Sequence, residues 1–401
     1  MSATSGYLLD RTVNNILWPL NVMQCLFFAP KYTVTNNALK INNKLCNIIC
    51  FFGTTIIIII HLLRCIEELP GYGAWNAIVE FIAIFDCFYY SFGFYLSYFT
   101  TLFNGKSNVG LVLIIQNLLK DSMLFKYKFS LKFNIFTRIQ VVLLFLFYNY
   151  VVFFILCFAN FQRYPYKTLI IFFLLRFDMD VIYATRLIKL LRMILLTWNR
   201  ERKYVSDNFE IERNSYLHKL AWKRLTNSYK DILKAYHIYK KVFSIMVSKI
   251  CLDKFIICNN IPKLKKNLLQ IFYHVMETFI HSLTYTYYPI IMASIMLLWI
   301  LKNVICICTL CYECEMFYKS VKDSDVACLL MMTSNTCSAK AACKTVHRAT
   351  RVTFRRMEAG GLITVDSKMP LQLINGLALN TIVLLQFALN KFLNNIPKWQ
   401  D

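Results

Sequence analysis

Ionisable and aromatic side chains stand inside stretches of this sequence that are otherwise apolar, where charged groups are costly to bury. Aromatic rings around a few polar groups are what a small-molecule pocket between helices requires. The sequence therefore predicts a ligand pocket, and its candidate residues are Glu80, Asp86, Tyr89, Tyr148, Asn149, Arg176, Asp178, His274, Glu277, His281 and Tyr285. A structural role is the alternative. Arg176 and Asp180 are spaced i, i+4 and can neutralise each other, and the tyrosines can form an interfacial belt.

The same side chains do not assemble a catalytic motif. The sequence has no phosphate-binding P-loop, no G-x-S-x-G nucleophile turn and no H-E-x-x-H zinc motif. His274 and Glu277 have the spacing of a reversed E-x-x-H motif, but no partner motif occurs elsewhere. The cysteine run from Cys306 to Cys314 also lacks a second cluster at zinc-site spacing. We therefore expect no enzyme activity, no cofactor and no metal.

The composition places these residues in a membrane. Hydrophobic residues make up 57% of the 401 residues and charged residues 17%, whereas a soluble chain has about 45–50% and about 25%. One globular core cannot hide so much apolar surface, and a membrane helix needs about 20 mostly apolar residues. The sequence therefore predicts an all-α, multi-pass membrane protein.

Seven apolar segments are long enough to span a bilayer. They cover about residues 46–64, 76–103, 136–159, 168–197, 271–286, 288–312 and 371–392. The first four form a unit, 46–197, on the side of the predicted pocket. A cytoplasmic helical region, 198–270, separates this unit from spans five and six at 271–312. The stretch Ile16–Pro30 is too short to span, so we expect an interfacial or packed helix within the N-terminal segment 1–45.

Lysine and arginine determine the predicted orientation. The formal net charge is +23, and the basic residues concentrate between the spans, above all from Arg186 to Lys266. Loops rich in these residues face the cytoplasm, which places the N-terminus inside and the C-terminus outside, the reverse of a G-protein-coupled receptor. The region 313–370 is then a cytoplasmic loop with the start of helix 7, and 393–401 an extracellular tail. The basic residues therefore indicate the orientation of the chain in the membrane. They do not indicate a nucleic acid partner. Anionic membrane lipid of the inner leaflet is the alternative partner.

The C-terminal region carries residues that resemble a known family. Gly361-Leu362-Ile363-Thr364-Val365-Asp366 is followed by an apolar helix that ends in Gln386-Phe387. Insect gustatory receptors typically show G-L-F-x-hydrophobic-Asp, then T-Y, five hydrophobic residues and Q-F. The runs LWILKN at 298–303 and CYECE at 311–315 also look like the sixth span of that family and its cytoplasmic end. The resemblance covers about Phe272 to Phe392.

The resemblance implies a ligand-gated, non-selective cation channel in the plasma membrane of chemosensory neurons. It implies a homotetramer, or a heterotetramer with related receptors, in which the seventh helix of each subunit, 371–392, lines one pore. Gln386 and Phe387 match the family's gate residues. A ring of phenylalanines would close the pore by dewetting, and a ring of amides would replace part of the hydration of monovalent and divalent cations. The alternative role for Gln386 is an interhelical hydrogen bond.

Several positions depart from the family pattern. Leu379 and Asn380 stand where the family has Thr-Tyr, and Ile363 replaces the usual phenylalanine. The divergent signature and the run Ala29-Pro30-Lys31-Tyr32 look more like the bitter-type branch of moths and butterflies, which implies a small tastant such as a bitter plant compound. An odorant-type receptor channel of the same superfamily is the alternative. A G-protein-coupled receptor would need the opposite orientation, and a transporter would need an internal repeat that the sequence lacks.

Residues 247–270 interrupt the resemblance. In the family, a segment like 242–246 runs almost directly into one like 271–273. Val247-Ser248 can be encoded by GTAAGT, and Leu269-Gln270 can end in CAG, which are the two edges of an intron. We therefore expect this block to be an insertion or a retained intron.

Overall fold

The structure is a computed structural model of the whole chain. It describes residues 7–8, 10–35, 38–68, 77–121, 142, 144, 146–149, 166–208, 216–259, 287–334, 337–359, 361, 363–372 and 375. The predicted spans three, five and seven therefore lie wholly or largely outside the described residues.

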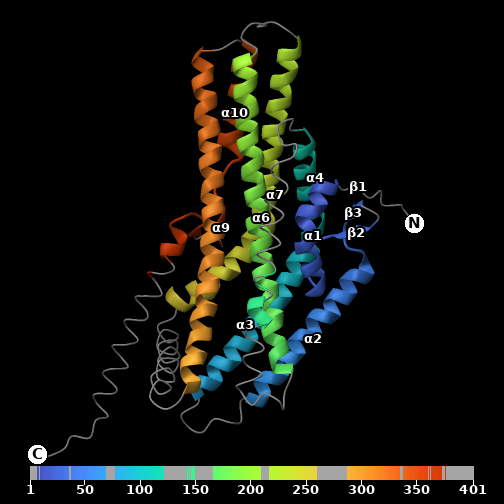
Figure 1. The fold of residues 1–401 in the computed structure, drawn as a ribbon, viewed down its shortest axis with the longest axis vertical. Coiled ribbons are helices and arrows are strands. Elements are labelled where there is room, and N and C mark those ends of the chain that lie inside the picture. Colours follow the sequence, from blue (N-terminus) through green and yellow to red (C-terminus); the bar gives the residue numbers. More distant parts are fainter. Residues whose placement is uncertain are drawn as a thin grey trace, which may run out of the picture.

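Long helices that run side by side form the main body of the molecule (Figure 1). They are α6 (Tyr166–Asn208), α7 (Tyr216–Asn259), α9 (Tyr287–Ser334) and the shorter α10 (Cys337–Thr353). At a rise of about 1.5 Å per residue, α6 and α9 are roughly 65–70 Å long, which is twice the thickness of a bilayer's hydrocarbon core. If α6 and α9 cross a bilayer at predicted spans four and six, both helices continue well beyond it. We call the part of this bundle that extends beyond the predicted membrane the stem. It consists of the C-terminal parts of α6 and α9, α7 up to Met246, and α10.

Apolar and aromatic side chains hold the stem together. Trp198 on α6 packs against Tyr229 on α7, with ring centroids 4.8 Å apart. The indole nitrogen of Trp198 donates a hydrogen bond of 2.8 Å to the carbonyl oxygen of Leu225. Tyr236 on α7 packs against Phe317 on α9 at 4.9 Å. All of these side chains are buried, so the cytoplasmic helix expected within 198–270 is part of a packed core.

The lower half of the molecule in Figure 1 contains two further helices that contact α6. They are α2 (Lys44–Glu68) and α3 (Ala77–Phe103), which also pack against each other. These helices, together with α6 and α9, coincide with predicted spans one, two, four and six. In the described part of the chain, only one of these helices has a segment long and apolar enough to cross a membrane by length and composition, Lys44–Leu63 of α2, so the other spans stay predictions.

Two shorter helices pack beside the main body, α1 (Arg11–Leu26) against α6 and α4 (Gly105–Asp121) against α7. The N-terminal helix, α1, buries Val13, Leu17 and Leu20 against the core. The second, α4, occupies part of what we expected to be a basic loop after span two. Apolar residues at helical spacing are buried on one face of α4, and their pattern was the signal for this helix: Val109, Leu111, Val112, Ile115 and Leu118.

Short strands accompany the helices at two places. The N-terminal strands β1 (Tyr7–Leu8), β2 (Thr33–Thr35) and β3 (Ala38–Lys40) form an antiparallel sheet in the order β1-β3-β2. After α10, β4 (Glu358–Ala359) and β5 (Ile363–Thr364) form a hairpin. The prediction of a helical chain is confirmed for the described residues, with these strands as additions.

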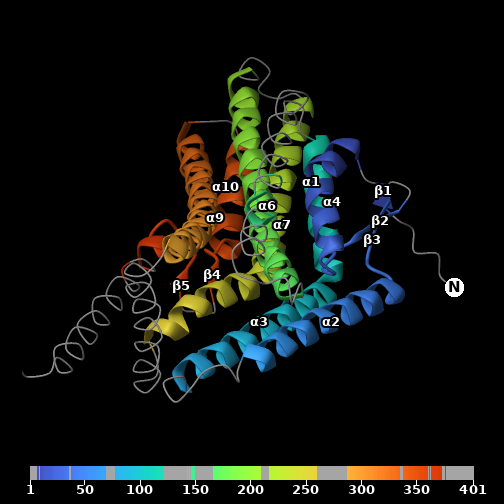
Figure 2. The same ribbon diagram turned by 60° about the horizontal axis from the view of Figure 1, so that its bottom comes forward.

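The end of α7 leaves the stem. Figure 2 shows the yellow, C-terminal part of α7 turning away from α6 and running beneath the β4–β5 hairpin. This part includes residues 247–259, the first half of the block that we expect to be an insertion.

Candidate functional site

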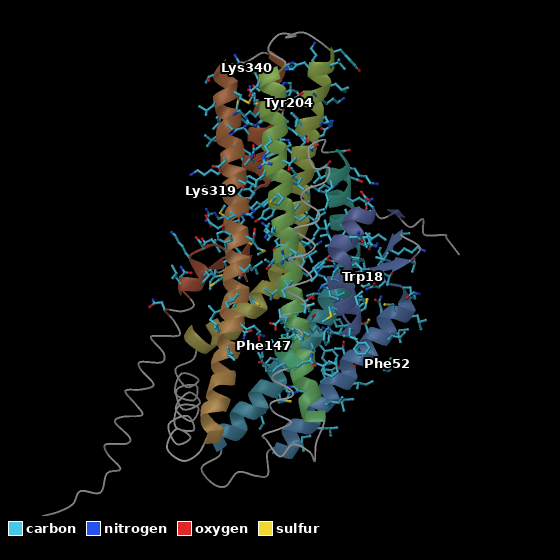
Figure 3. All side chains as sticks on the ribbon, viewed as in Figure 1. Trp18, Phe52, Phe147, Tyr204, Lys319 and Lys340 are labelled. Carbon is cyan, nitrogen blue, oxygen red and sulfur yellow. The ribbon has the colours of Figure 1, made fainter. Side chains whose placement is uncertain are left out.

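A lysine, an aspartate and a tyrosine meet in the centre of the predicted membrane region. The Tyr148 hydroxyl donates a hydrogen bond of 2.6 Å to Oδ2 of Asp178 on α6. The ammonium group of Lys302 on α9 binds the same oxygen as an ion pair. It also donates to the Tyr148 hydroxyl at 3.1 Å and lies 5.1 Å from the centre of that ring. Figure 3 shows the neighbouring Phe147 where α6 and α9 run close together, in the lower half of the molecule.

Within this triad, the charges of Lys302 and Asp178 neutralise each other. Tyr148 is fully buried, and the side chains of Lys302 and Asp178 are only 12% and 10% exposed. A buried charge is tolerated when a counter-ion and hydrogen bonds replace its water, which this geometry provides. The triad also joins three separate segments of the chain, so it links the positions of α6 and α9.

A second ion pair lies on another side of α6. Lys31 pairs with Oδ1 of Asp180 at 2.8 Å and lies 3.3 Å from the Thr101 hydroxyl. Ser97 on α3 donates to Oδ2 of Asp180 at 3.0 Å. We expected the N-terminal segment 1–45, which contains Lys31, to be cytoplasmic, and we considered Arg176 as the partner of Asp180. Lys31 is instead buried, and it supplies the ion pair that the structure gives Asp180.

Arg176 points toward α2 and α3. Its Nη1 donates a hydrogen bond of 3.2 Å to the Thr54 hydroxyl, and its guanidinium lies 5.8 Å from the centre of the Phe94 ring. Arg176 is only 2% exposed, and its Nε and Nη2 atoms have no hydrogen-bond partner among the described residues. Burying donors without hydrogen-bond partners costs free energy, so these two nitrogen atoms of Arg176 destabilise the fold.

The helix geometry explains why these groups separate. Residues two apart on an α-helix point in nearly opposite directions, whereas residues four apart share a face. Asp178 therefore faces α9 while Arg176 and Asp180 face the α2–α3 side. We call the set of Arg176, Asp178 and Asp180 with the partners described above the buried polar layer.

The structure brings together part of the predicted pocket. Tyr148, Arg176 and Asp178 belong to the buried polar layer. Tyr89 is half-buried on α3 and packs edge-to-face on Tyr90, with centroids 5.5 Å apart. Asn149 is exposed.

The remaining predicted pocket residues are not placed by the structure. Glu80 and Asp86 lie on the backbone of α3, but their side chains are outside the described residues. His274, Glu277, His281 and Tyr285 lie outside the described residues altogether.

Sequence reasoning missed the partners in this layer. Lys302, Lys31, Ser97 and Thr54 were not predicted as site residues. Lys302 carried a usable signal, since a lysine within the apolar segment 288–312 must find a counter-ion. The pairing itself depends on tertiary packing and has no signature in the sequence.

The run Gly361–Asp366 after α10 forms a turn and a helix cap. Gly361 has a φ of 72°, a left-handed conformation that glycine adopts without a steric penalty, and it lies in the turn between β4 and β5. Oδ1 of Asp366 accepts hydrogen bonds from the backbone N–H groups of Lys368 at 2.9 Å and Met369 at 3.3 Å. This is the geometry of an N-cap, and a helical segment begins at Met369.

Asp366 is also tied to the stem. Its Oδ2 accepts from Thr364 at 3.2 Å and from Arg356 at 3.4 Å. The Tyr318 hydroxyl on α9 accepts from the backbone N–H of Met357 at 3.1 Å. The start of the predicted last span is therefore attached both to its own hairpin and to α9.

The remaining signature residues are not described. Leu362 and the predicted gate residues Gln386 and Phe387 lie outside the described part of the chain. Their roles stay predictions.

Comparison with known proteins identifies the fold. No protein-family model matches the chain, and no curated protein matches its sequence. By its backbone, however, the chain has the fold of an insect chemoreceptor. One solved structure that it resembles is the olfactory receptor OR5 of Machilis hrabei in complex with eugenol. The TM-score is 0.56 at 11% identity, and the match covers 94% of this chain and 100% of that receptor.

Proposed function

We propose that the chain is an insect chemoreceptor that acts as a ligand-gated, non-selective cation channel of the gustatory type. The observation that carries this proposal is the fold shared with an insect olfactory receptor over 94% of the chain. The capped hairpin at Gly361–Asp366 supports it, because it is built from the residues that resemble the gustatory signature. The channel is a tetramer in which the last span of each subunit lines the pore, with Gln386 and Phe387 at the gate.

The proposed ligand is a small tastant, and a bitter plant compound is the preferred class. The receptor of similar fold was solved with the small aromatic molecule eugenol, so this fold accommodates a small organic ligand in at least one protein. The ligand opens the channel by its greater affinity for the open state. The side of the molecule that holds the buried polar layer is the proposed ligand-binding side. Its charged pairs offer orienting groups beside aromatic rings such as Phe177, which lies 4.8 Å from Phe94.

The test is whole-cell recording from cells that express the chain, against a panel of plant alkaloids, sugars and volatile aromatics. We expect cation currents with at least one alkaloid and a reduced or altered current in Gln386→Ala. Currents evoked only by volatile aromatics would favour the second candidate, an odorant-type channel, which the olfactory receptor's likeness supports.

The orientation needs a separate measurement. We expect an epitope at the C-terminus to be labelled on intact cells, because an odd number of spans with a cytoplasmic N-terminus ends outside. Labelling only after permeabilisation would contradict the channel topology and restore the G-protein-coupled receptor as an alternative.

A further inference from the structure

A basic pocket lies in the stem, away from the buried polar layer. It has a volume of about 570 Å³ and lies between α7 and α10. This volume is within the range of about 300–1,000 Å³ that is typical of small-molecule sites. Its basic lining residues are Lys230, Lys234, His237, Lys240 and Arg355. The members on α7 are spaced three or four residues apart, so they share the helix face that lines the pocket.

The charge of this pocket is not compensated by acids. No aspartate or glutamate lines it. Among the described residues, no ion pair joins its lysines or Arg355 to an acid. Some other cations of the stem are paired: Arg192 lies 3.2 Å from Glu313, and Arg224 lies 3.6 Å from Glu201. The pocket therefore brings together like charges that no acid among its lining residues neutralises.

The end of α10 opposes an anion only weakly. The last turn of α10 contributes Val352 and Thr353 to the lining, and its free carbonyl groups carry a partial negative charge of roughly half an electron. Three lysines and one arginine outweigh that half charge. The residues Cys337–Thr353 of α10 contain no acid that would reduce the positive potential further.

The pocket begins near the level of the inner membrane surface. Tyr236, next to His237, packs on Phe317, and residue 312 is where predicted span six ends. The end of the pocket at Lys240 therefore lies close to that surface. Lys230 lies roughly 15 Å farther along α7, toward the cytoplasm. The charged groups of the pocket are therefore distributed over roughly 15 Å along α7.

We propose that this pocket binds a polyphosphorylated inositol, either as the headgroup of an inner-leaflet lipid or free in the cytosol. Cations spread over such a length match an anion with several phosphates better than one with a single charge. Lysine binds phosphate as a point charge, and the guanidinium of Arg355 can bind two phosphate oxygens at once. Leu233 and Val352 provide apolar surface for the inositol ring.

The first test is binding of inositol trisphosphate to the purified full chain in detergent, measured by calorimetry. We expect the double variant Lys234→Gln/Arg355→Gln to bind at least about tenfold more weakly, because each loses a charge-assisted hydrogen bond. The matched control is Lys219→Gln/Lys340→Gln, which removes the same charge from exposed positions of α7 and α10 outside the pocket. Figure 3 places Lys340 at the far end of the stem.

The second test adds short-chain phosphatidylinositol bisphosphate to the same micelles, with phosphatidylserine at equal charge for comparison. Saturable binding of the lipid alone assigns the lipid source, binding of the free trisphosphate alone assigns the cytosolic source, and binding of both assigns the shared headgroup.

Three results would overturn the proposal: no binding of either probe, equal binding of phosphatidylserine, or equal loss in the control variant. Size-exclusion profiles check that each variant is folded, and Lys230→Gln/Lys240→Gln replaces the first variant if that one is not. The readout is binding and needs no current, so its result is independent of the proposed channel function.

Discussion

The buried polar layer shows how single residues set the direction of their neighbours. Asp178 and Asp180 are two residues apart, and each takes a lysine from a different part of the chain. Lys302 comes from α9, and Lys31 from the segment between α1 and α2. The charged groups of α6 therefore act as separate anchors for the segments around it.

Replacing Lys302 by methionine should destabilise the protein. The change leaves Asp178 buried without its counter-ion, which costs about 3–5 kcal/mol in comparable pairs. We expect Lys302→Met to unfold at a clearly lower temperature in detergent. The exposed Lys319→Met on the same helix should unfold like the wild type.

A double-mutant cycle tests the pairing itself. Adding Asp178→Asn to Lys302→Met removes the unpaired charge and keeps an acceptor for Tyr148, so part of the stability should return. Additive losses in the double variant would contradict the ion pair.

A second residue-scale device is a buried histidine in the stem. The indole N–H of Trp222 donates to Nε2 of His218 at 2.9 Å, and Nδ1 of His218 lies 3.2 Å from the Ser338 hydroxyl on α10. Burial lowers the pKa of His218 below its ordinary value of 6.5. The neutral ring is thus favoured in the folded state, and protonating Nε2 would break the bond from Trp222.

The pH dependence follows from the sign of this shift. Above pH 6.5 the histidine is neutral both folded and unfolded, so its full contribution is present. As the pH falls through 6.5 toward the lower folded pKa, the unfolded chain takes up the proton first and stability is lost.

We expect His218→Gln, whose amide oxygen can accept from Trp222, to lose less thermal stability than the wild type between neutral and mildly acidic pH. The matched control is the exposed His237→Gln on the same helix. Equal slopes for His218→Gln and the wild type would contradict this role.

At the scale of elements, the hairpin and cap after α10 precede the predicted last span and fix the start of the helical segment at Met369. Arg356 connects Asp366 to Glu315 on α9, with distances of 3.4 Å and 3.8 Å. Glycine and aspartate at these positions meet two physical needs, a left-handed turn and an N-cap acceptor. The sequence match alone could not supply that explanation.

Asp366→Ala should weaken the start of the last span. Loss of an N-cap costs about 0.5–2 kcal/mol, and the Arg356 contact is lost as well. We expect a lower unfolding temperature, whereas Asp366→Asn should lose less because its amide oxygen can still accept from Lys368 and Met369. An alanine variant as stable as the asparagine variant would show that the cap contributes nothing.

A second question at this scale is whether residues 247–270 belong to the mature protein. Half of this block extends α7 away from the stem (Figure 2). If the block is a retained intron, sequencing the transcript should give a spliced message without these codons. A chain lacking 247–270 should reach the cell surface in larger amount than the full chain, because Met246 then joins Ile271 without the intervening lysines and Pro262. A spliced message that contains these codons would contradict the retained-intron hypothesis.

Sequence patterns predicted some of the helices and missed others. Long apolar runs located α2, α3, α6 and α9, because burial in lipid requires an apolar run of fixed length. The helix α4 was missed because its lysines suggested a loop, although Val109 and Val112 mark its buried face. The ion pairs of Lys31 and Lys302 could not be predicted, since nothing local in the chain records which distant segment packs beside it.

For the whole molecule, the length of α6 and α9 matters most. Each helix is longer than a bilayer's hydrocarbon core is thick, and each continues without a break from the buried polar layer into the stem (Figure 1). A movement of α9 at Lys302 would therefore reach Tyr318 without a change of element. We propose that this continuity couples ligand binding on the proposed ligand-binding side to the proposed gate in the last predicted span.

The central claim is that the last span lines a gated pore, and a current that needs no ligand tests it most directly. Membrane conductance is recorded in cells expressing the wild type, Phe387→Ala and the control Phe392→Ala, with surface expression matched by an external tag. Removing the phenylalanine ring should wet the constriction. We expect a constitutive cation current in Phe387→Ala and none in Phe392→Ala. Equal, background conductance in all three, at matched surface expression, would contradict the central claim.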